Sequence, residues 1–424
     1  YQKITVSTFS YFYCSTMFFK RSTYFFLGLL LLIGCKKDIP SGITPVDPEP
    51  IDRSKMPIPA GFTDNLASIK ISSIANANEP GSSRPELIQD ISGKNASYCH
   101  PDVEYFPKGF NGYKYWMVFT PYFGILGSDR AASLYENPSI VVSNDGKEWI
   151  TPTGLSNPIQ RRPALEDSYI PPSGIPNQGY WSDVDWNFNG KEFELYYRGC
   201  FFSNKILRQW GAKSNNNTRK LNQEAERVVV RQTSIDGIHW TPLEVVYTSN
   251  EPASIQDNHI ISPSFVRNEN EMFSYEVDFK PTYQSPIMTN ILLRSSSNGL
   301  DFTAYRNSRQ VKFINKPWLE LNKSYSTWHL QAAYIDGYYF LCLAIGNVDR
   351  YSSDLNYLAY SKDGIHFRVF ETPLASSNVY RSAVFAKSSS TNDIEFGAVI
   401  GYKSGAFGYR EFKLNKKVLE DGLK

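Results

Sequence analysis

This 424-residue chain has little net charge, few cysteines and few histidines, and each of these features argues against some classes of protein. The 44 Lys and Arg nearly balance the 42 Asp and Glu, so a net charge of +2 gives no global field toward nucleic acid or an acidic surface. The five Cys contain no C-x-x-C pair, which argues against a zinc ribbon and a disulfide framework. Cys342 is expected to be a buried small hydrophobe, and a Cys99–Cys200 bridge stays open.

Several catalytic signatures are also absent from the chain. There is no phosphate-binding G-x-x-x-x-G-K-S/T loop and no G-x-S-x-G nucleophile elbow. The five His form no H-E-x-x-H pair, so catalytic zinc is not expected. No stretch keeps a helical period, which disfavours an α/β fold.

Long apolar runs are lacking too, and the run near the N-terminus, residues 24–33, is shorter than the ~20 residues of a membrane helix. Lys20 and Arg21 precede it, and residues 32–35 (Leu-Ile-Gly-Cys) resemble a bacterial lipobox. We therefore expect residues 1–35 to be a signal peptide, with Met17 as an alternative start and Cys35 as the lipidated residue. The protein would then be anchored to a bacterial membrane and face the periplasm or the exterior. An ordinary signal peptide or a short anchor helix is the alternative.

The next segments differ in composition from the remainder of the chain. Residues 36–60 are rich in Pro, Asp and Ser, which indicates a flexible tether. Residues 61–97 form a lead-in with a candidate strand near residues 68–74 and a covering loop. Residues 98–424 are left for a folded domain.

Aromatic residues are abundant, at 15% of the chain, and favour strands over helices. Four segments share the motif Ser-x-Asp/Asn-Gly-x-x-aromatic, here called the box: residues 143–149, 234–240, 296–302 and 361–367. Asp-Gly and Asn-Gly suit a tight hairpin turn, because both central residues tolerate positive φ. The aromatic residue that ends each box is expected to pack back into its sheet.

Strand-like runs surround each box and form five sets, the last of them without a box. A set of about four antiparallel strands exposes an edge and a face, and radial closure of several sets buries both. The sequence therefore predicts an all-β fold, a five-bladed β-propeller of four-stranded antiparallel blades around a central axis.

Polar residues cluster where the first strand of each predicted blade begins, which in a propeller lies at the axis. Further polar residues lie where the second strands end and where the third strand of blade one begins. The candidate site residues are His100, Asp102, Glu136, Trp181, Asp183, Arg198, Glu276, Trp328, His329, Tyr380 and Arg381.

Asp102 and Asp183 are predicted to occupy the same place in adjacent blades. Paired carboxylates at a concave site are what glycoside hydrolysis needs, one as the acid and one as the base or nucleophile. Aromatic residues would stack on sugars and arginines would bind hydroxyls or a carboxylate. The alternative for either Asp is a turn cap through its own backbone.

Histidines support the same face. His100, His259 and His329 all precede first strands, whereas His239 and His366 lie inside boxes and are expected to be exposed. A functional role is expected for at least one of the first three, although a lone His is more often a structural hydrogen-bonding group.

Over residues 98–415 the chain resembles the propeller glycosidases of glycoside hydrolase family 43 (arabinanases and β-xylosidases) and the related invertases and levansucrases. The resemblance implies Asp102 as general base, Asp183 as the carboxylate that tunes the acid, and His329 as an axial residue beside calcium, another ion or water. The family has a Glu in blade three as general acid, and this sequence departs from the family at residues 261–264, where no Glu is present. Glu276 is the nearest candidate acid and Glu136 the second.

These observations predict an extracytoplasmic glycoside hydrolase that acts on a poly- or oligosaccharide, without a required cofactor. A non-catalytic glycan-binding lipoprotein is the alternative, favoured by the missing Glu, and a structural lipoprotein is the third possibility. A carbohydrate ligand and a monomer are expected, and nucleic acid is not. Fold alone decides none of these, because propellers carry many functions.

Overall fold

A computed structural model describes residues 57–72, 98–121, 136–160, 180–200, 213–214, 227–248, 260–279, 286–303, 309–350 and 352–424. The predicted signal peptide, Cys35, most of the tether and His259 lie outside these residues. Within the described ranges, no helix is long and apolar enough to span a bilayer.

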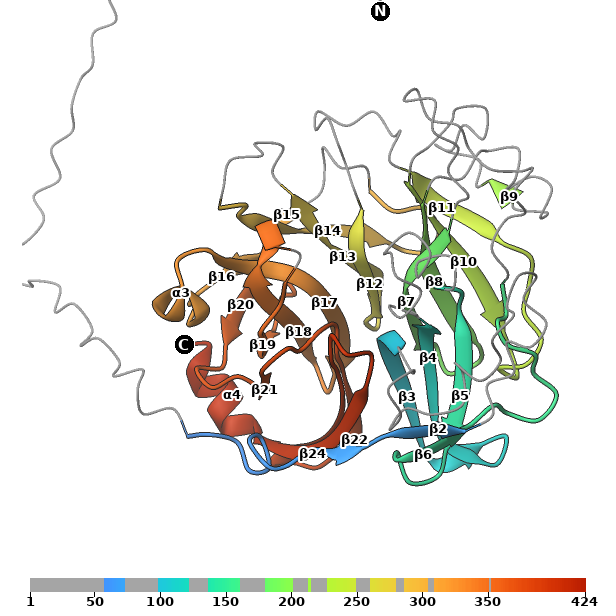
Figure 1. The fold of residues 1–424 in the computed structure, drawn as a ribbon, viewed down its shortest axis with the longest axis horizontal. Helices are drawn as coiled ribbons and strands as arrows, with labels where there is room; N and C mark the ends of the chain where they lie inside the picture. The colour runs from blue at the N-terminus through green and yellow to red at the C-terminus, as the bar shows by residue number, and fades with distance from the viewer. Residues whose placement is uncertain are drawn as a thin grey trace, which may run out of the picture. The chain divides into compact units, whose positions relative to one another are not determined.

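The described strands of residues 57–424 form five sheets around a common axis, which confirms the predicted five-bladed propeller (Figure 1). Blade one runs outward through β3 (Tyr98–Phe110), β4 (Tyr113–Pro121), β5 (Ser139–Ser143) and β6 (Glu148–Ile150). Blade two runs through β7 (Tyr180–Phe188), β8 (Phe193–Cys200), β10 (Arg227–Ser234), β11 (Glu244–Thr248) and β9 (Lys213–Ser214).

The remaining blades repeat this order. Blade three holds β12 (Ile261–Arg267), β13 (Met272–Phe279), β14 (Thr289–Ser296) and β15 (Arg309–Gln310). Blade four holds β17 (Tyr325–Ile335), β18 (Tyr338–Asn347), β19 (Leu355–Ser361), β20 (His366–Val369) and β16 (Lys312–Phe313), and β21 (Ala375–Ser376) also pairs with β19. Blade five holds β22 (Ala383–Ser389), β23 (Asp393–Gly401) and β24 (Phe407–Asn415). Helical elements are short: α3 (Trp318–Leu321), η6 (Val348–Arg350) and α4 (Lys416–Gly422).

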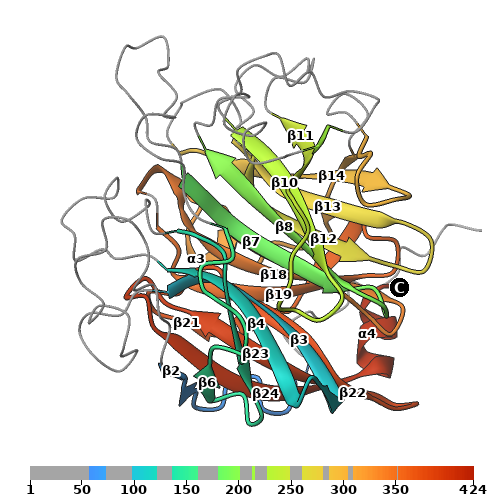
Figure 2. The ribbon, with the colours of Figure 1, turned by 90° about the vertical axis from the view of Figure 1, so that its right-hand side faces the viewer.

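Alternation along the strands explains why the blades stack. In β4, Tyr115 and Met117 pack into the cluster shared with blade five, whereas Trp116 and Val118 pack into the cluster shared with blade two. Successive side chains of a strand point to opposite faces, so a strand that is apolar on both faces must lie between two other sheets. Figure 2 shows the sheets side by side from a second direction.

A single N-terminal segment completes two blades. Within it, β1 (Ala67–Ser68) pairs antiparallel with β24 of blade five, and β2 (Lys70–Ser72) pairs parallel with β6 of blade one. Ile69 and Ile71 are fully buried. Arg410 adds hydrogen bonds to the backbone carbonyls of Phe62 and Asp64. Two short strands thus lie where one was predicted near residues 68–74, and residues 73–74 lie outside the described ranges. The first of them, β1, supplies the outer strand that the last repeat lacks.

The boxes are turns held by side chains. In the fourth box, Asp363 Oδ1 accepts the backbone N–H groups of Ile365 and His366, both at 2.8 Å, and Ser361 Oγ accepts the N–H of Gly364 at 3.0 Å. Among the described residues, the glycine of each box has positive φ but the Asp or Asn before it does not. The predicted two-residue turn with both φ positive is therefore wrong, and an Asx-type turn replaces it.

Each box also packs against the preceding blade. Tyr196 of blade two donates to the Gly299 carbonyl at 2.9 Å, and Tyr275 of blade three donates to the Gly364 carbonyl at 2.9 Å. The box motif thus recurs because it is a joint between blades as well as a turn.

Candidate functional site

Pairing of the first strand with the second is irregular near its start in blades one to four, and in blades one to three it skips two residues of the first strand. Pairing with the second strand shifts between Cys99 and Asp102, between Ser182 and Asp185, and between Ile261 and Ser264. The unpaired stretch of each strand begins with a non-glycine residue at positive φ: His100 at 55°, Asp183 at 50° and Ser262 at 49°. Such residues cost roughly 1–3 kcal/mol each, and bulges of this kind re-aim side chains beside active sites.

The bulges correct the predicted alignment of the blades. By register, Asp183 is equivalent to His100, and the residue equivalent to Asp102 is Asp185. The prediction that Asp102 and Asp183 occupy the same place is therefore wrong. The axial side chains form two layers, and these two carboxylates belong to different ones.

The deeper layer joins the blades. A side chain of each of four first strands accepts a backbone N–H of the next: Asp102 from Trp186 (3.0 Å), Asp185 from Phe265 (2.7 Å), Ser264 from Ala332 (2.7 Å) and Gln331 from Val384 (3.1 Å). Asp102 also accepts from Val103 and Gln331. Burial raises the pKa of Asp102 to about 6 although these hydrogen bonds oppose the shift. We call this layer the staple layer.

The second layer is the axial cluster of His100, Asp183 and His329, contributed by β3, β7 and β17. Asp183 Oδ1 lies 3.1 Å from His100 Nε2 and 3.5 Å from His329 Nδ1. One ligand atom of each residue lies within 4.8 Å of the others, and all three residues are buried. Residues from three separate blades therefore converge on one point of the axis.

Several atoms of the axial cluster have no hydrogen-bond partner although they are buried. They are His100 Nε2, Asp183 Oδ1, and both ring nitrogens of His329. Buried polar atoms are nearly always satisfied in native proteins. Three of these atoms, one from each residue, lie close together, which indicates a site built to hold something else.

Charges around the cluster fix its protonation. Burial alone would raise the pKa of Asp183, but Arg198 at 2.8 Å, together with the two histidines, holds it well below its usual range. Burial lowers the pKa of His100 well below its usual value, and lowers that of His329 as well. Arg381 pairs with Asp185 at 2.8 Å and lies 3.8 Å from Asp183. The cluster thus combines neutral imidazoles with an ionised carboxylate.

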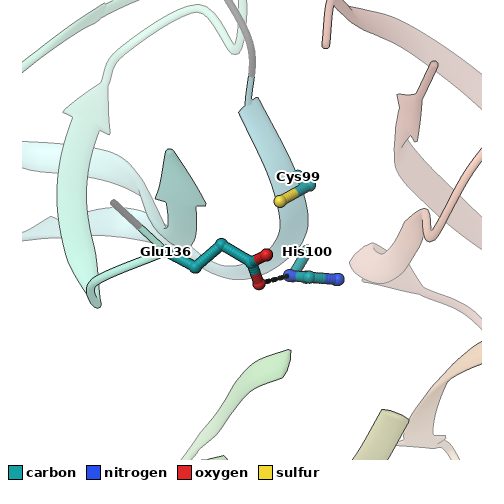
Figure 3. Close-up of side chains that lie close together, drawn as sticks. All are labelled: Cys99, His100 and Glu136. Carbon is teal, nitrogen blue, oxygen red and sulfur yellow. Dashed lines mark ion pairs between the residues drawn. The ribbon is translucent and has the colours of Figure 1, made fainter. Parts of the chain in front are cut away.

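Two further side chains, Glu136 and Cys99, lie near the other ring nitrogen of His100. Figure 3 shows Glu136 and Cys99 on the Nδ1 side of the ring, with Glu136 Oε2 at 3.9 Å from Nδ1. Burial raises the pKa of Glu136 to about 8, and Ser182 donates a hydrogen bond to its carboxyl group. Burial also raises the pKa of the Cys99 thiol, so this sulfur stays protonated and is a poor ligand. Cys99 and Cys342 are both free and buried, so Cys99 forms no bridge to Cys200.

The predicted aromatic residues lie at different depths. The Tyr380 ring is half-buried, 4.5 Å from the His329 ring and 5.7 Å from that of His100, so it borders the axial cluster. Trp328 packs edge-on against His329 at 5.2 Å. Trp181 is fully buried against Tyr197 and presents no face on which a sugar can stack.

Glu276 of β13 is buried in an ion pair with an arginine of the same blade. Its Oε1 accepts from Arg294 Nε at 2.5 Å, and neither side chain is exposed. Its role as catalytic acid stays a prediction, and its surroundings favour a structural ion pair. Sequence reasoning missed Asp185, Gln331 and Thr120; the Asp-x-Asp spacing of residues 183–185 was the only signal for the first of them.

No known family profile matches the chain. A curated relative, the A type blood N-acetyl-α-D-galactosamine deacetylase of Flavonifractor plautii, is 43% identical over 79 residues, which are 19% of this chain and 10% of the relative. The match thus spans about a tenth of that relative's length.

Solved structures share the fold. An N-acetylgalactosamine deacetylase from F. plautii, in complex with blood group B trisaccharide, has a TM-score of 0.57 at 17% identity and covers 84% of this chain and 97% of its own. A family 117 glycoside hydrolase of Zobellia galactanivorans has a TM-score of 0.46 at 10% identity (82% and 89%), and a Bacillus subtilis arabinanase one of 0.42 at 13% (76% and 96%).

Proposed function

We propose that this chain is a carbohydrate-active hydrolase that removes an acetyl group from an N-acetylated amino sugar. In this proposal the axial cluster would hold a divalent transition metal. The observation that carries the proposal is the buried His100–Asp183–His329 cluster with its unpartnered, mutually facing atoms. The short match to a relative named as a deacetylase, and the shared fold with a second, support this bond class.

The residues of the cluster fit a metal. Two imidazoles and one carboxylate, with positions left open, are a set typical of zinc and other first-row transition metals. Calcium prefers oxygen ligands, so of the ions expected beside His329 the residues favour a transition metal. Ligands must be deprotonated to bind, and the lowered pKa values of His100 and Asp183 meet this requirement. When bound, such an ion polarises a carbonyl oxygen.

The chain's own residues then supply positioning and proton transfer. Hydrolysis of an acetamide adds water to the carbonyl carbon, breaks the C–N bond and delivers a proton to the leaving amine. Glu136 is the carboxyl group placed beside the cluster to move that proton, and a pKa of about 8 suits transfer near neutral pH. Ser182 orients this carboxyl group. Tyr380 offers the half-buried aromatic face against which a sugar ring can lie.

Glycoside hydrolysis is the second candidate, and one observation favours it. Glu136 carries a proton at neutral pH whereas Asp183 is ionised, and both lie beside His100. A protonated acid and an ionised carboxylate are the pair that glycosidases use. In this reading they replace the predicted pair of Asp102 and Glu276.

The location of the protein is also a proposal. The lipobox-like residues 32–35 support a lipid anchor at Cys35 and an extracytoplasmic location. Metabolic labelling with a fatty-acid analogue should mark the wild type and leave Cys35→Ala unlabelled. Equal labelling of the two proteins would contradict the anchor.

One experiment separates the candidate activities. Chelator-treated protein is given Zn²⁺, Mn²⁺ or Ca²⁺ and a panel of N-acetylated glycans, and released acetate and new reducing ends are both measured. We expect acetate without reducing ends, dependent on a transition metal and lost in His329→Gln. His239→Gln, which changes an exposed histidine of the second box, is the matched control and should behave as wild type. Reducing ends without acetate would select the glycosidase, and glycan binding without either product the non-catalytic alternative.

A further inference from the structure

Thr120 lies directly behind His100, on the side away from the axial cluster. It is the penultimate residue of β4, stands opposite Cys99 in the strand register and is fully buried. Its Oγ1 is 2.8 Å from His100 Nδ1 and 3.1 Å from Cys99 Sγ, and 3.4 Å from the carbonyl oxygen of Cys99. This one hydroxyl therefore serves the imidazole and the backbone next to it.

The Thr120 hydroxyl has one hydrogen to donate. His100 Nδ1 donates or accepts according to its tautomer, whereas the Cys99 carbonyl only accepts, so we assign the hydroxyl hydrogen to the carbonyl. The lone pairs of Oγ1 then face His100 Nδ1, which must carry a hydrogen to bond with them. A neutral imidazole has one N–H, so Nε2 is left with a lone pair.

The lone pair is directed at the axial cluster. His100 Nε2 lies 3.1 Å from Asp183 Oδ1, and neither atom has a hydrogen-bond partner. Two lone pairs this close together suit coordination of one shared cation. His329 contrasts with His100, because both of its ring nitrogens lack a hydrogen-bond partner.

We propose that Thr120 is a positioning residue that holds His100 in its Nδ1–H tautomer and so presents Nε2 to a metal in the axial cluster. The metal half of this inference rests on the proposed function, whereas the tautomer half does not. Partners of this kind, behind a ligating histidine, typically change metal affinity about 10–100-fold when removed.

The test uses two readouts on the full chain. Ring-¹⁵N histidine spectra of the metal-free protein report the tautomer directly, and the chain has only five histidines to assign. Titration with Zn²⁺ alone by calorimetry reports affinity. Thr120→Val removes the hydroxyl at constant shape, and Thr120→Ser keeps it.

We expect the wild type and Thr120→Ser to show the Nδ1–H form at His100, and Thr120→Val to lose it and bind Zn²⁺ about 10–100-fold more weakly. Thr233→Val, at a buried threonine of blade two, controls for the loss of any hydroxyl. An unchanged tautomer in Thr120→Val, or an Nε2–H tautomer in the wild type, would overturn the inference. If the wild type binds no Zn²⁺, the proposed function fails and the spectra still decide the role of Thr120. Should Thr120→Val not fold, Thr120→Ala takes its place.

Discussion

Side chains at the axis divide by what their oxygen atoms contact. Both Asp102 and Asp183 accept a backbone N–H of the next blade, from Trp186 and Ser262, but Asp183 also pairs with an arginine and has an oxygen that faces two imidazoles. Both carboxylates thus join neighbouring blades, and Asp183 belongs to the axial cluster as well. Burial by itself would not separate them, since both are almost completely buried.

Substitution of Asp102 tests this division. Asp102→Ala leaves the Trp186 N–H without an acceptor, so we expect a loss of about 1–3 kcal/mol in the free energy of unfolding, measured by urea denaturation. Asp102→Asn keeps one acceptor oxygen and should lose less. Turnover per folded molecule should stay within about tenfold of wild type. A collapse of turnover with unchanged stability would instead support the general-base role that the family resemblance implies.

At the scale of the element, the boxes show how one short motif does two things. Its Asp or Asn side chain closes the turn, and its glycine lets the neighbouring blade approach. A Cβ on Gly364 would lie 2.8 Å from the Tyr275 hydroxyl and 2.9 Å from the Phe273 ring, at a φ of +71°. The glycine is therefore needed for space as well as for conformation.

Two glycine substitutions separate these requirements. Gly364→Ala should destabilise the protein by both backbone strain and steric overlap, whereas Gly190→Ala, at φ +90° with nothing within 4 Å, should show the strain alone. We expect a loss of about 1–2 kcal/mol at Gly190 and a clearly larger one at Gly364, read from chemical denaturation curves. Equal losses would mean that the box does not act as a joint between blades.

The boxes also predict how stability depends on pH. Burial alone would raise the pKa of Asp236 and Asp363, but hydrogen bonds from a His ring and from backbone N–H groups together lower it below the usual value. A lowered folded-state pKa gives stability that is present above the unfolded pKa of about 3.9 and is lost as pH falls below it.

Asn298 already closes the third box without a titrating group, accepting from Leu300 and Asp301. Changing Asp236 and Asp363 to Asn should therefore keep the turns and flatten the fall in melting temperature between about pH 5 and pH 2. Changing both to Ala should lower the melting temperature at every pH. An Asn variant that tracks wild type through the acid range would refute the assignment.

At the scale of the molecule, the N-terminal segment closes the ring by adding a strand to blade five and another to blade one. A chain that begins after residue 72 should lose the burial of Ile69 and Ile71, roughly 3–6 kcal/mol in total. Calorimetry should show a lower and broader transition than that of a chain beginning at residue 53. Identical transitions would show that the segment is dispensable.

The sequence predicts the propeller well because its signals are local and repeated. Box turns and alternating strands need no knowledge of distant contacts. The register at the axis is harder to predict, because a bulge shifts the strand pairing without changing the pattern of apolar residues. Two acidic residues, Asp183 and Asp185, lie in the bulged stretch, and the sequence pattern aligns Asp183 with Asp102 although Asp185 is the equivalent residue. Thr120 gave no signal either, since its role depends on the ring placed beside it.

The joining of Ala67 to Tyr409 has a consequence for synthesis. The outer strand of the last blade leaves the ribosome long before the strand with which it pairs. Until the final residues emerge, the ring lacks the contact that joins its fifth blade to its first. The order of the strands thus delays closure of the ring until synthesis of the chain is nearly complete.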